Sequence, residues 1–302
     1  HTLTEMKTYI TSCLNNGTIK NLIINNSKAS TPTAAASTDG WQCATAVVAY
    51  TDGTAPRIER VLLTQSDLHG KYDGGGIVGK NNASMLYVDE VVSAGSIIRN
   101  EDNTHYMGGI VGYNVTNLTV TDSYSINSTI IDPYPNSWGG GIVGGTGTGS
   151  ASRTILTNTF SSGKIPVTDR SGGLIGVDQR SRYDDPRTIT NSYYDSDIAG
   201  TTYPYESGKS ESYTGKRLPT SEMIGNKLQS KYGSDGTWIY TNGYYPRLSW
   251  VANHPATKLY SATRGAFTSV DGATSTTDLF NGNVYGVIQV PAELQSNGYS
   301  VT

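Results

Sequence analysis

The densest group of ionisable side chains lies in residues 178–187, which read Asp-Gln-Arg-Ser-Arg-Tyr-Asp-Asp-Pro-Arg. Enzymes that cleave polysaccharides need paired carboxylates, or a carboxylate beside a basic residue, to act as acid and base. Asp184 and Asp185 would supply that pair here. Both signs of charge, however, mix around a proline, which is typical of a solvated loop with local ion pairs. We therefore expect a surface loop at this position and no catalytic residues.

Residue types that bind metals are present but poorly grouped. Asp195 and Asp197 could ligate calcium, yet the acidic, glycine-rich nonapeptides of calcium-binding β-helices are absent from the sequence. No His-x-x-x-His or histidine–glutamate pairing supports zinc catalysis, because the four histidines are widely spaced: His1, His69, His105 and His254. We expect no metal and no cofactor.

Cys13 and Cys43 are the two cysteines of the chain, and they lie 30 residues apart. They could face each other on neighbouring coils and form a disulfide, or remain two buried free thiols. The sequence leaves both alternatives open. A metal site built from two cysteines without a nearby histidine is not expected.

Aromatic side chains are the remaining candidates for ligand contact, and tyrosine is abundant, with 21 residues. Exposed rings could stack on sugars or anchor a protein partner, whereas their ordinary role is packing in the core and loops. We single out Trp138 and Tyr183 as ligand contacts. The wider aromatic set contains Tyr72, Tyr106, Tyr113, Tyr134 and Tyr203.

A repeat in the middle of the chain must position these side chains. Two apolar residues bracketed by glycines recur four times, starting at glycines 75, 108, 140 and 172, which are 33, 32 and 32 residues apart. A degenerate copy at residues 45–49 has small residues in place of the glycines. Such a period is typical of an array in which each unit buries its apolar face against its neighbours. The repeat glycines are Gly75, Gly76, Gly79, Gly108, Gly109, Gly112, Gly140, Gly141, Gly144, Gly172, Gly173 and Gly176.

The repeat predicts stacked coils of a parallel β-helix. A second β-rich run follows each glycine-bracketed strand, and two strands per period are too few for a propeller blade. We expect one interior ladder of the residues that follow the second glycine, and a second ladder on the opposite side of the same sheet. The first ladder is Ile77, Ile110, Ile142 and Leu174, and the second is Val78, Val111, Val143 and Ile175.

The glycines themselves are expected to serve the fold. They would permit positive φ angles and the close approach of another layer. They bracket strands and precede no helix, so they are not phosphate-binding loops. The sequence also contains no Gly-x-Ser-x-Gly nucleophile motif and no Walker-type loop.

Both flanks of the repeat have a different character. Residues 3–14 carry apolar side chains at spacings of three and four, which is compatible with a short amphipathic helix or an irregular cap. Pro219 opens a predicted helix that ends before Gly233, and aromatic segments follow, which indicates a C-terminal lid on the array. Residues 251–302 read as a linker and a β-rich tail, either the start of an immunoglobulin-like module or an extension of the lid.

Composition excludes several classes of partner. Only 16% of the 302 residues are charged and the net charge is −3, so a nucleic-acid backbone or an anionic membrane is not expected to bind. No run of 18 apolar residues is present, so we expect no membrane span. Since the chain starts at His1, we expect a trimmed or mature segment, and the missing signal peptide does not indicate the cytoplasm.

Over roughly residues 40 to 200, the Gly-Gly-(Leu/Ile)-Val-Gly core followed by an Asn-Ser-Tyr-type strand resembles the GLUG-motif repeat family. Residues 218–223 and 243–248 look like the tail that often closes such arrays. The resemblance implies a right-handed parallel β-helix in secreted or surface-anchored bacterial proteins similar to adhesins, or in segments of IgA-specific metallopeptidases. It supplies no catalytic residues. Thr45, Ala46 and Ala49 depart from the motif, since glycines stand there in the family.

We therefore predict an all-β chain with three parts: a right-handed parallel β-helix (solenoid) of about five coils over residues 1–200, a small α/β cap with one helix over residues 201–250, and the β-rich tail. The expected function is a non-enzymatic, extracellular bacterial surface protein that acts in cell adhesion or as a structural spacer. Its partner would be a host or surface protein or a glycan. The alternatives are a carbohydrate-binding or carbohydrate-active β-helix, and an accessory segment of a surface protease.

Overall fold

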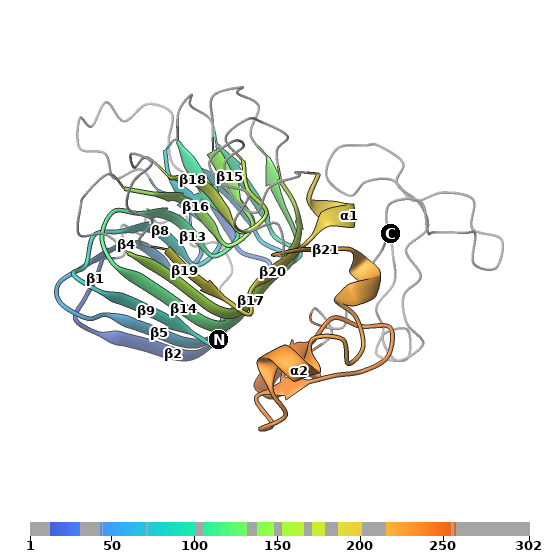
Figure 1. Ribbon diagram of the computed structural model, residues 1–302. Helices are drawn as coiled ribbons and strands as arrows, with labels where there is room; N and C mark the ends of the chain where they lie inside the picture. Colours follow the sequence, from blue (N-terminus) through green and yellow to red (C-terminus); the bar gives the residue numbers. More distant parts are fainter. Residues whose placement is uncertain are drawn as a thin grey trace.

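The computed structural model describes residues 13–30, 43, 45–70, 72–100, 105–131, 138–147, 153–165, 171–178, 187–200, 216–254 and 257. In these residues the chain is mainly β-strand, wound into parallel coils that stack on one another (Figure 1). This confirms the predicted all-β parallel β-helix. The predicted tail from residue 258 onward lies outside the described residues.

Three parallel sheets form the walls of the array. The first contains β1 (Cys13–Asn15), β4 (Val48–Asp52), β8 (Val78–Asn81), β13 (Val111–Asn114), β16 (Val143–Thr146) and β18 (Ile175–Asp178). The second is short and contains β7 (Gly74–Gly75), β12 (Tyr106–Gly108) and β15 (Trp138–Gly140).

The third sheet is the largest, with 12 strands that reach from the first coil to the last. Its long members run through a corner of the coil, so that one strand serves two walls. The twelve strands of this sheet are β2 (Thr18–Asn25), β3 (Lys28–Ser30), β5 (Arg57–Thr64), β6 (Asp67–Gly70), β9 (Leu86–Asp89), β10 (Val92–Ala94), β11 (Ile97–Asn100), β14 (Leu118–Ile131), β17 (Thr154–Lys164), β19 (Arg187–Thr190), β20 (Tyr193–Asp195) and β21 (Arg217–Leu218).

The glycine-bracketed repeats stack in the predicted register. Val48 pairs with Val78, Val78 with Val111, Val111 with Val143, and Val143 with Ile175. The pairing of Val48 places the degenerate copy at residues 45–49 one coil before the first complete repeat. Cys13 in β1 pairs with Tyr50, so one further strand precedes that copy.

Both predicted ladders lie inside the array, and the prediction that the second lies on the opposite side of the sheet is wrong. Ile77 and Val78 are both fully buried in one core. Their two amides donate to the same carbonyl oxygen of Ile110, each at 3.0 Å. The chain therefore bends between the two residues, and neighbouring side chains both point inward.

The repeat glycines are required by close packing. A Cβ atom on Gly109 would collide with the carbonyl oxygen of Gly141 and lie 2.5 Å from the Oγ of Ser125. The expectation that these glycines need positive φ is wrong, because the positive-φ glycines of the described chain all lie elsewhere, for example Gly95 and Gly225. Close approach of the next layer is the part of the prediction that is confirmed.

A ladder of polar side chains is buried between these walls. Thr51 Oγ1 donates to Asn81 Oδ1 at 2.6 Å, and Asn81 Nδ2 donates to Asn114 Oδ1 at 2.7 Å. Asn114 Nδ2 in turn donates to Thr154 Oγ1 at 3.0 Å. Four consecutive coils are thus joined by side-chain hydrogen bonds as well as by strand pairing, and buried amides of this kind need such partners.

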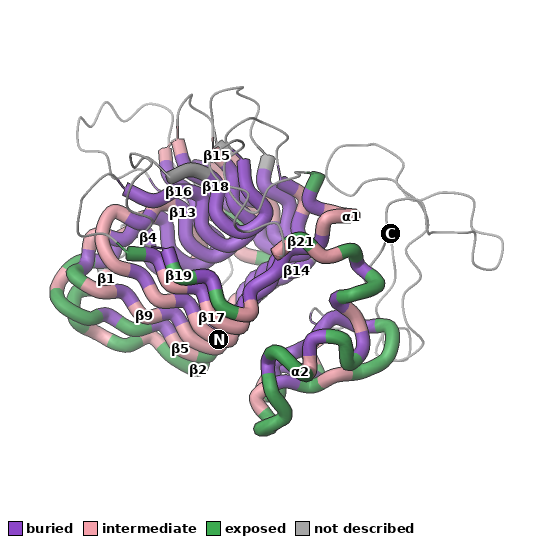
Figure 2. Tube along the Cα trace, in the orientation of Figure 1, coloured by how far each residue is buried: buried purple, intermediate pink, exposed green. Residues whose placement is uncertain are grey.

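The C-terminal cap, residues 216–254, starts at the end of the array, where β21 pairs with β20, and then lies along the side of the array (Figures 1 and 2). An outward column of apolar side chains explains this position, since Met223, Trp238, Tyr245 and Leu248 of the cap share a hydrophobic cluster with it. Each member of the column pairs with the next: Leu62, Val92, Tyr124, Phe160 and Tyr193. The prediction of a lid where the periodicity stops is therefore corrected to a lateral cover.

The single helix predicted after Pro219 is divided in two. A 3-10 helix spans Thr220–Glu222, and α2 spans Gln229–Tyr232. Gly225 between them has a φ of 68°, which ends right-handed helical geometry. Short elements complete the described chain: α1 (Ser196–Ala199), the antiparallel pair β22 (Trp238–Ile239) and β23 (Arg247–Leu248), and a 3-10 helix at Ser249–Val251. Among the described residues, no helix is long and apolar enough to cross a membrane.

Candidate functional site

Four of the aromatic residues singled out from the sequence come together at one corner of the array. Tyr106 begins β12, Tyr113 lies in β13 and Trp138 begins β15. Tyr72 lies beside His105, with ring centroids 4.5 Å apart in an edge-to-face arrangement. The corner sits next to the glycine-bracketed bend, because the repeat places one aromatic just before the glycines and another just after them.

Three of these rings form a stack. Tyr106 lies parallel to Tyr113 at a centroid distance of 4.2 Å and to Trp138 at 4.6 Å. A Cβ on Gly145 would collide with the Tyr106 ring, so the glycine of the next coil makes room for it. The Lys80 Nζ atom lies 5.5 Å from the Tyr113 centroid. We call Lys80, Tyr113, Tyr106 and Trp138 the aromatic column.

The stacking restricts what the column can bind. Both faces of the Tyr106 ring are covered by its neighbours, so a sugar ring cannot stack on it. Tyr113 and Trp138 end the stack and are each partly exposed. A ligand would therefore meet the edges of the rings or the two ends, and Trp138 stays a candidate ligand contact.

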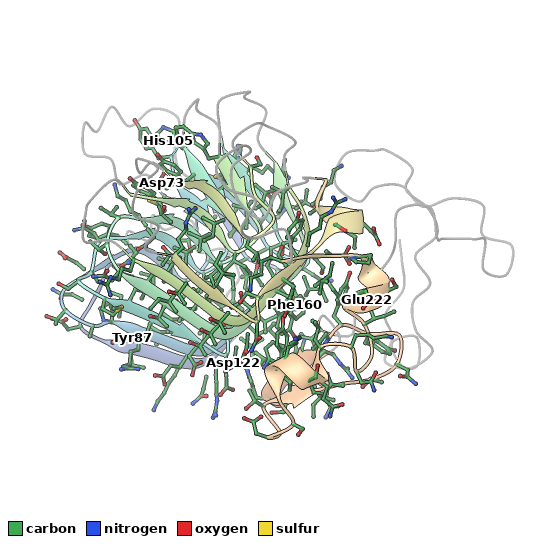
Figure 3. All side chains as sticks on the ribbon, in the orientation of Figure 1. Asp73, Tyr87, His105, Asp122, Phe160 and Glu222 are labelled. Carbon is green, nitrogen blue, oxygen red and sulfur yellow. The ribbon has the colours of Figure 1, made fainter. Side chains whose placement is uncertain are left out.

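A buried carboxylate lies behind this corner. Asp73 is 5% exposed, and its burial raises the pKa to about 7, against the lowering effects of the Lys80 charge and the Tyr106 amide. The Tyr106 amide donates to Asp73 Oδ1 at 3.3 Å, and His105 Nδ1 lies 3.8 Å from the same oxygen (Figure 3). Asp73 holds the corner strand in place and is too deeply buried to meet a substrate.

A second group of residues, which the sequence did not reveal, lies on the open outer face of the large sheet. Glu59 in β5 pairs with Asp89 in β9, so their side chains are neighbours on adjacent coils. Arg57 lies 3.8 Å from Glu59, and Arg60 lies 3.1 Å from Glu90. We call Arg57, Glu59, Arg60, Asp89 and Glu90 the charged face. A shallow hollow of about 230 Å³ is lined by Lys20, Asn21, Glu59, Arg60, Asp89 and Glu90.

Within the charged face, Asp89 has a raised pKa. Its pKa is raised to about 6, first by partial burial and then by the charges of Glu90, Asp122 and Glu59, while the charge of Arg60 lowers it. Carboxylates on adjacent coils with a nearby arginine match the pattern that carbohydrate cleavage requires. Glu59 and Glu90 are however already paired with arginines, and the face is open.

The residues predicted from sequence near the end of the array have structural roles. Asp195 is fully buried and accepts hydrogen bonds from Thr220 Oγ1 at 2.6 Å and Tyr245 Oη at 2.5 Å. Asp197 Oδ2 accepts from the Thr220 amide at 2.9 Å. Both carboxylates thus fasten the cap to the last coil. No group of three metal-binding residue types occurs in the described part of the chain.

The remaining predicted residues separate into two groups. Tyr183, Asp184 and Asp185 lie outside the described residues. Cys43 is buried and free, so the disulfide alternative is not realised in the structure. Burial also raises the pKa of the Cys43 thiol, which keeps it protonated and unreactive.

Comparison with known proteins gives two likenesses. No protein-family model matches the chain. The chain is 26% identical over 215 residues to Halomucin of Haloquadratum walsbyi (strain DSM 16790 / HBSQ001), a match that covers 62% of this chain but only 2% of Halomucin. Among solved structures, the chain is similar to a candidate immunoglobulin A1 protease from Bacteroides ovatus, with a TM-score of 0.46 and 14% identity. That similarity covers 76% of this chain and 75% of the other.

Proposed function

We propose that the chain is a rigid, non-enzymatic module of a secreted or cell-surface protein, and that it acts as a spacer that carries an adhesive surface. The observation that carries the proposal is the continuous stack, in which side chains such as Ile58, Val88, Val120 and Leu156 are buried coil after coil. A stack of this kind sets a fixed distance between its ends. The sequence similarity to a stretch of Halomucin supports an extracellular setting.

The repeats are proposed to be of the GLUG type. The support is the glycine-bracketed core, whose glycines meet neighbouring backbone so closely that no Cβ fits, as at Gly109 and Gly141. The residues that define the repeat therefore have a role in packing and none in catalysis. This agrees with a structural module that acts as a spacer.

We place the adhesive contact at the exposed ends of the aromatic column. Trp138 and Tyr113 are partly exposed, and Lys80 adds a positive charge beside them. Tryptophan and tyrosine are among the side chains that most often dominate binding energy at protein contacts. The partner would be a glycan or a surface protein.

The test is binding of the purified full chain to an array of purified glycans, and adhesion of chain-coated beads to cultured epithelial cells. Trp138→Ala should weaken whichever interaction is found by at least tenfold. Trp250→Ala, which changes a tryptophan of the cap, should leave it unchanged. If neither probe binds, the adhesive part of the proposal is wrong and only the spacer role stands.

The charged face favours a second function, a carbohydrate-active β-helix. Glu59 and Asp89 are neighbouring carboxylates, and Asp89 has a pKa near the value that suits a general acid. Turnover of a polysaccharide that is lost in both Glu59→Gln and Asp89→Asn would replace the spacer proposal with this one. Asp52→Asn, at an exposed carboxylate of β4, is the matched control.

A further inference from the structure

The N-terminal end of the array is less well covered than the rest of the core. Ile19, Leu22 and Ile24 of β2 point inward but are only partly buried. Their partners in the next coil are fully buried, and these partners are Ile58, Val61 and Leu63. The interior of the first coil therefore exposes apolar surface along the axis of the array.

The backbone at this end is also available for pairing. Within the described residues, β2 pairs with β5 and with no other strand. Ile23 pairs with Leu62 and continues the outward apolar column, yet it is 53% exposed, while Leu62 is fully buried. An exposed edge strand with apolar side chains is a template for another strand.

The residues of β2 are complementary to a second copy of themselves. Antiparallel pairing centred between Asn21 and Leu22 sets Ile19 opposite Ile24 of the second copy, so that these two inward residues meet. Leu22 lies opposite Asn21, the residue with a φ of 57° at which β2 turns its corner. The same register sets Lys20 opposite Ile23 of the second copy, so outward residues meet and no like charges are opposed. The charged residues of 13–30 are Lys20 and Lys28, and this register sets Lys28 opposite Asn15, so no lysine faces a lysine of the second copy.

The other end of the array is closed. Ile165, Tyr194 and Ala199 are at most 2% exposed, and the Ile165 amide donates to the Ala199 carbonyl of α1 at 3.0 Å. β21 pairs with β20 at this end. Head-to-tail stacking would need two open ends, whereas one open end permits only a closed, two-fold pair.

From these observations we propose that the N-terminal end of the array docks the same end of a second copy, with the two β2 strands antiparallel. The result is a two-fold dimer. This inference is independent of the proposed function, since it concerns only the edge and the interior of the first coil.

Sedimentation velocity of the full chain over a hundredfold range of concentration tests the proposal. The unmodified chain should sediment as a dimer, and Ile23→Lys should weaken the dimer at least tenfold, because the new lysine would lie opposite Lys20 of the second copy. Ile239→Lys is the matched control, since Ile239 is an exposed isoleucine of the cap at 37% exposure. Its dimer should be unchanged, and the circular dichroism of both variants should match the parent.

Hydrogen–deuterium exchange supplies the second readout. Amides of β2 should exchange slowly in the dimer and at least tenfold faster in Ile23→Lys, with β14 unchanged in both. A monomer at every concentration overturns the proposal, and slow β2 exchange in that monomer would show that another part of the chain covers the end. A dimer indifferent to Ile23→Lys, or a ladder of larger species, also overturns it.

Discussion

Two halves of the same strands face different surroundings. In the first half of β5, β14 and β17, buried residues alternate with more exposed ones (Figure 2). Glu59 is one of the partly exposed residues, on an open face of the sheet. In the second half the outward side chains are buried beneath the cap, as with Phe160 (Figure 3). The hydrogen bonding of the sheet continues through both halves. The difference teaches that the outward side chains, and not the backbone, determine where the cap binds.

One residue per coil marks the boundary between the open half and the covered half. It has a left-handed conformation in every case: Asn21, Arg60, Glu90, Asp122, Asn158 and Asn191 have φ between 42° and 57°. Asparagine and aspartate adopt this conformation most readily. Arg60 and Glu90 do not share that preference, and their ion pair at 3.1 Å joins the two corners. Each coil therefore contributes its own left-handed residue to the boundary between the two halves.

The largest effect on stability is expected at the repeat glycines, because the open half and the covered half both depend on their close packing. Gly109→Val should lower the free energy of unfolding by about 3 kcal/mol or more, because the side chain would collide with Gly141 and Ser125. The measurement is urea unfolding followed by circular dichroism. Hydrogen exchange should accelerate in the open and the covered half of β14 alike. An unfolding curve that matches the parent would show that close packing of the repeat glycines is not required.

Removing a ring from the covered half comes next. Phe160 is fully buried, stacked on Tyr124 at 4.7 Å and close to Tyr245 at 5.6 Å. Phe160→Ala should destabilise the chain by about 3 kcal/mol through lost contacts and a residual cavity. Ile155→Ala, in the open half of the same strand, should lose about 1 kcal/mol or less because Ile155 is partly exposed. Equal losses in the urea titration would remove the distinction between the halves.

A smaller effect is expected at the boundary itself. Asp122 Oδ1 accepts hydrogen bonds from Asn158 Nδ2 at 3.0 Å and from Trp238 Nε1 of the cap at 2.9 Å. Asp122→Ala leaves both donors unpaired and should cost about 1–2 kcal/mol. Tryptophan fluorescence during thermal unfolding reports the change, since Trp238 is the donor. Glu222→Ala, at an exposed carboxylate of the cap, should stay within about 0.5 kcal/mol of the parent.

The smallest effect is a pH dependence confined to the open half. The pKa of Asp89 is raised from 3.8 to about 6 in the folded chain, so folding favours its protonated form. Its contribution to stability is therefore present below pH 4 and is lost as the pH rises through 6. Asp89→Asn should flatten the dependence of the unfolding free energy on pH across that interval. Parallel curves for variant and parent would show that Asp89 is not perturbed.

The sequence predicts the walls of the array because the glycine period itself states the register. Once Gly75 and Gly108 are aligned, the pairing of Val78 with Val111 follows, as the structure confirms. Even the degenerate copy was placed correctly, since Val47 and Val48 keep the apolar pair between small residues. Where repeats must pack this closely, the spacing of their residues in the sequence is therefore enough to predict the strand register.

The side position of the cap and the charged face left no such signal. Val61, Leu62 and Leu63 form an unbroken apolar run, so their periodicity could not tell that Leu62 points outward beneath the cap. Glu59 and Asp89 lie 30 residues apart in sequence, and only a known register brings them side by side. By contrast, carboxylates that are adjacent in sequence, such as Asp184 and Asp185, are visible without any knowledge of the register.

The lateral cap has a mechanical consequence. In a simple solenoid each coil holds only its neighbours, so tension along the axis can peel coils away one after another. Here the cap packs against side chains of several coils at once, from Val92 through Tyr124 and Phe160 to Tyr193. Tension must therefore detach the whole cap before any coil that contacts it can unfold. We expect these later coils to unfold together, at a higher force than the first coil.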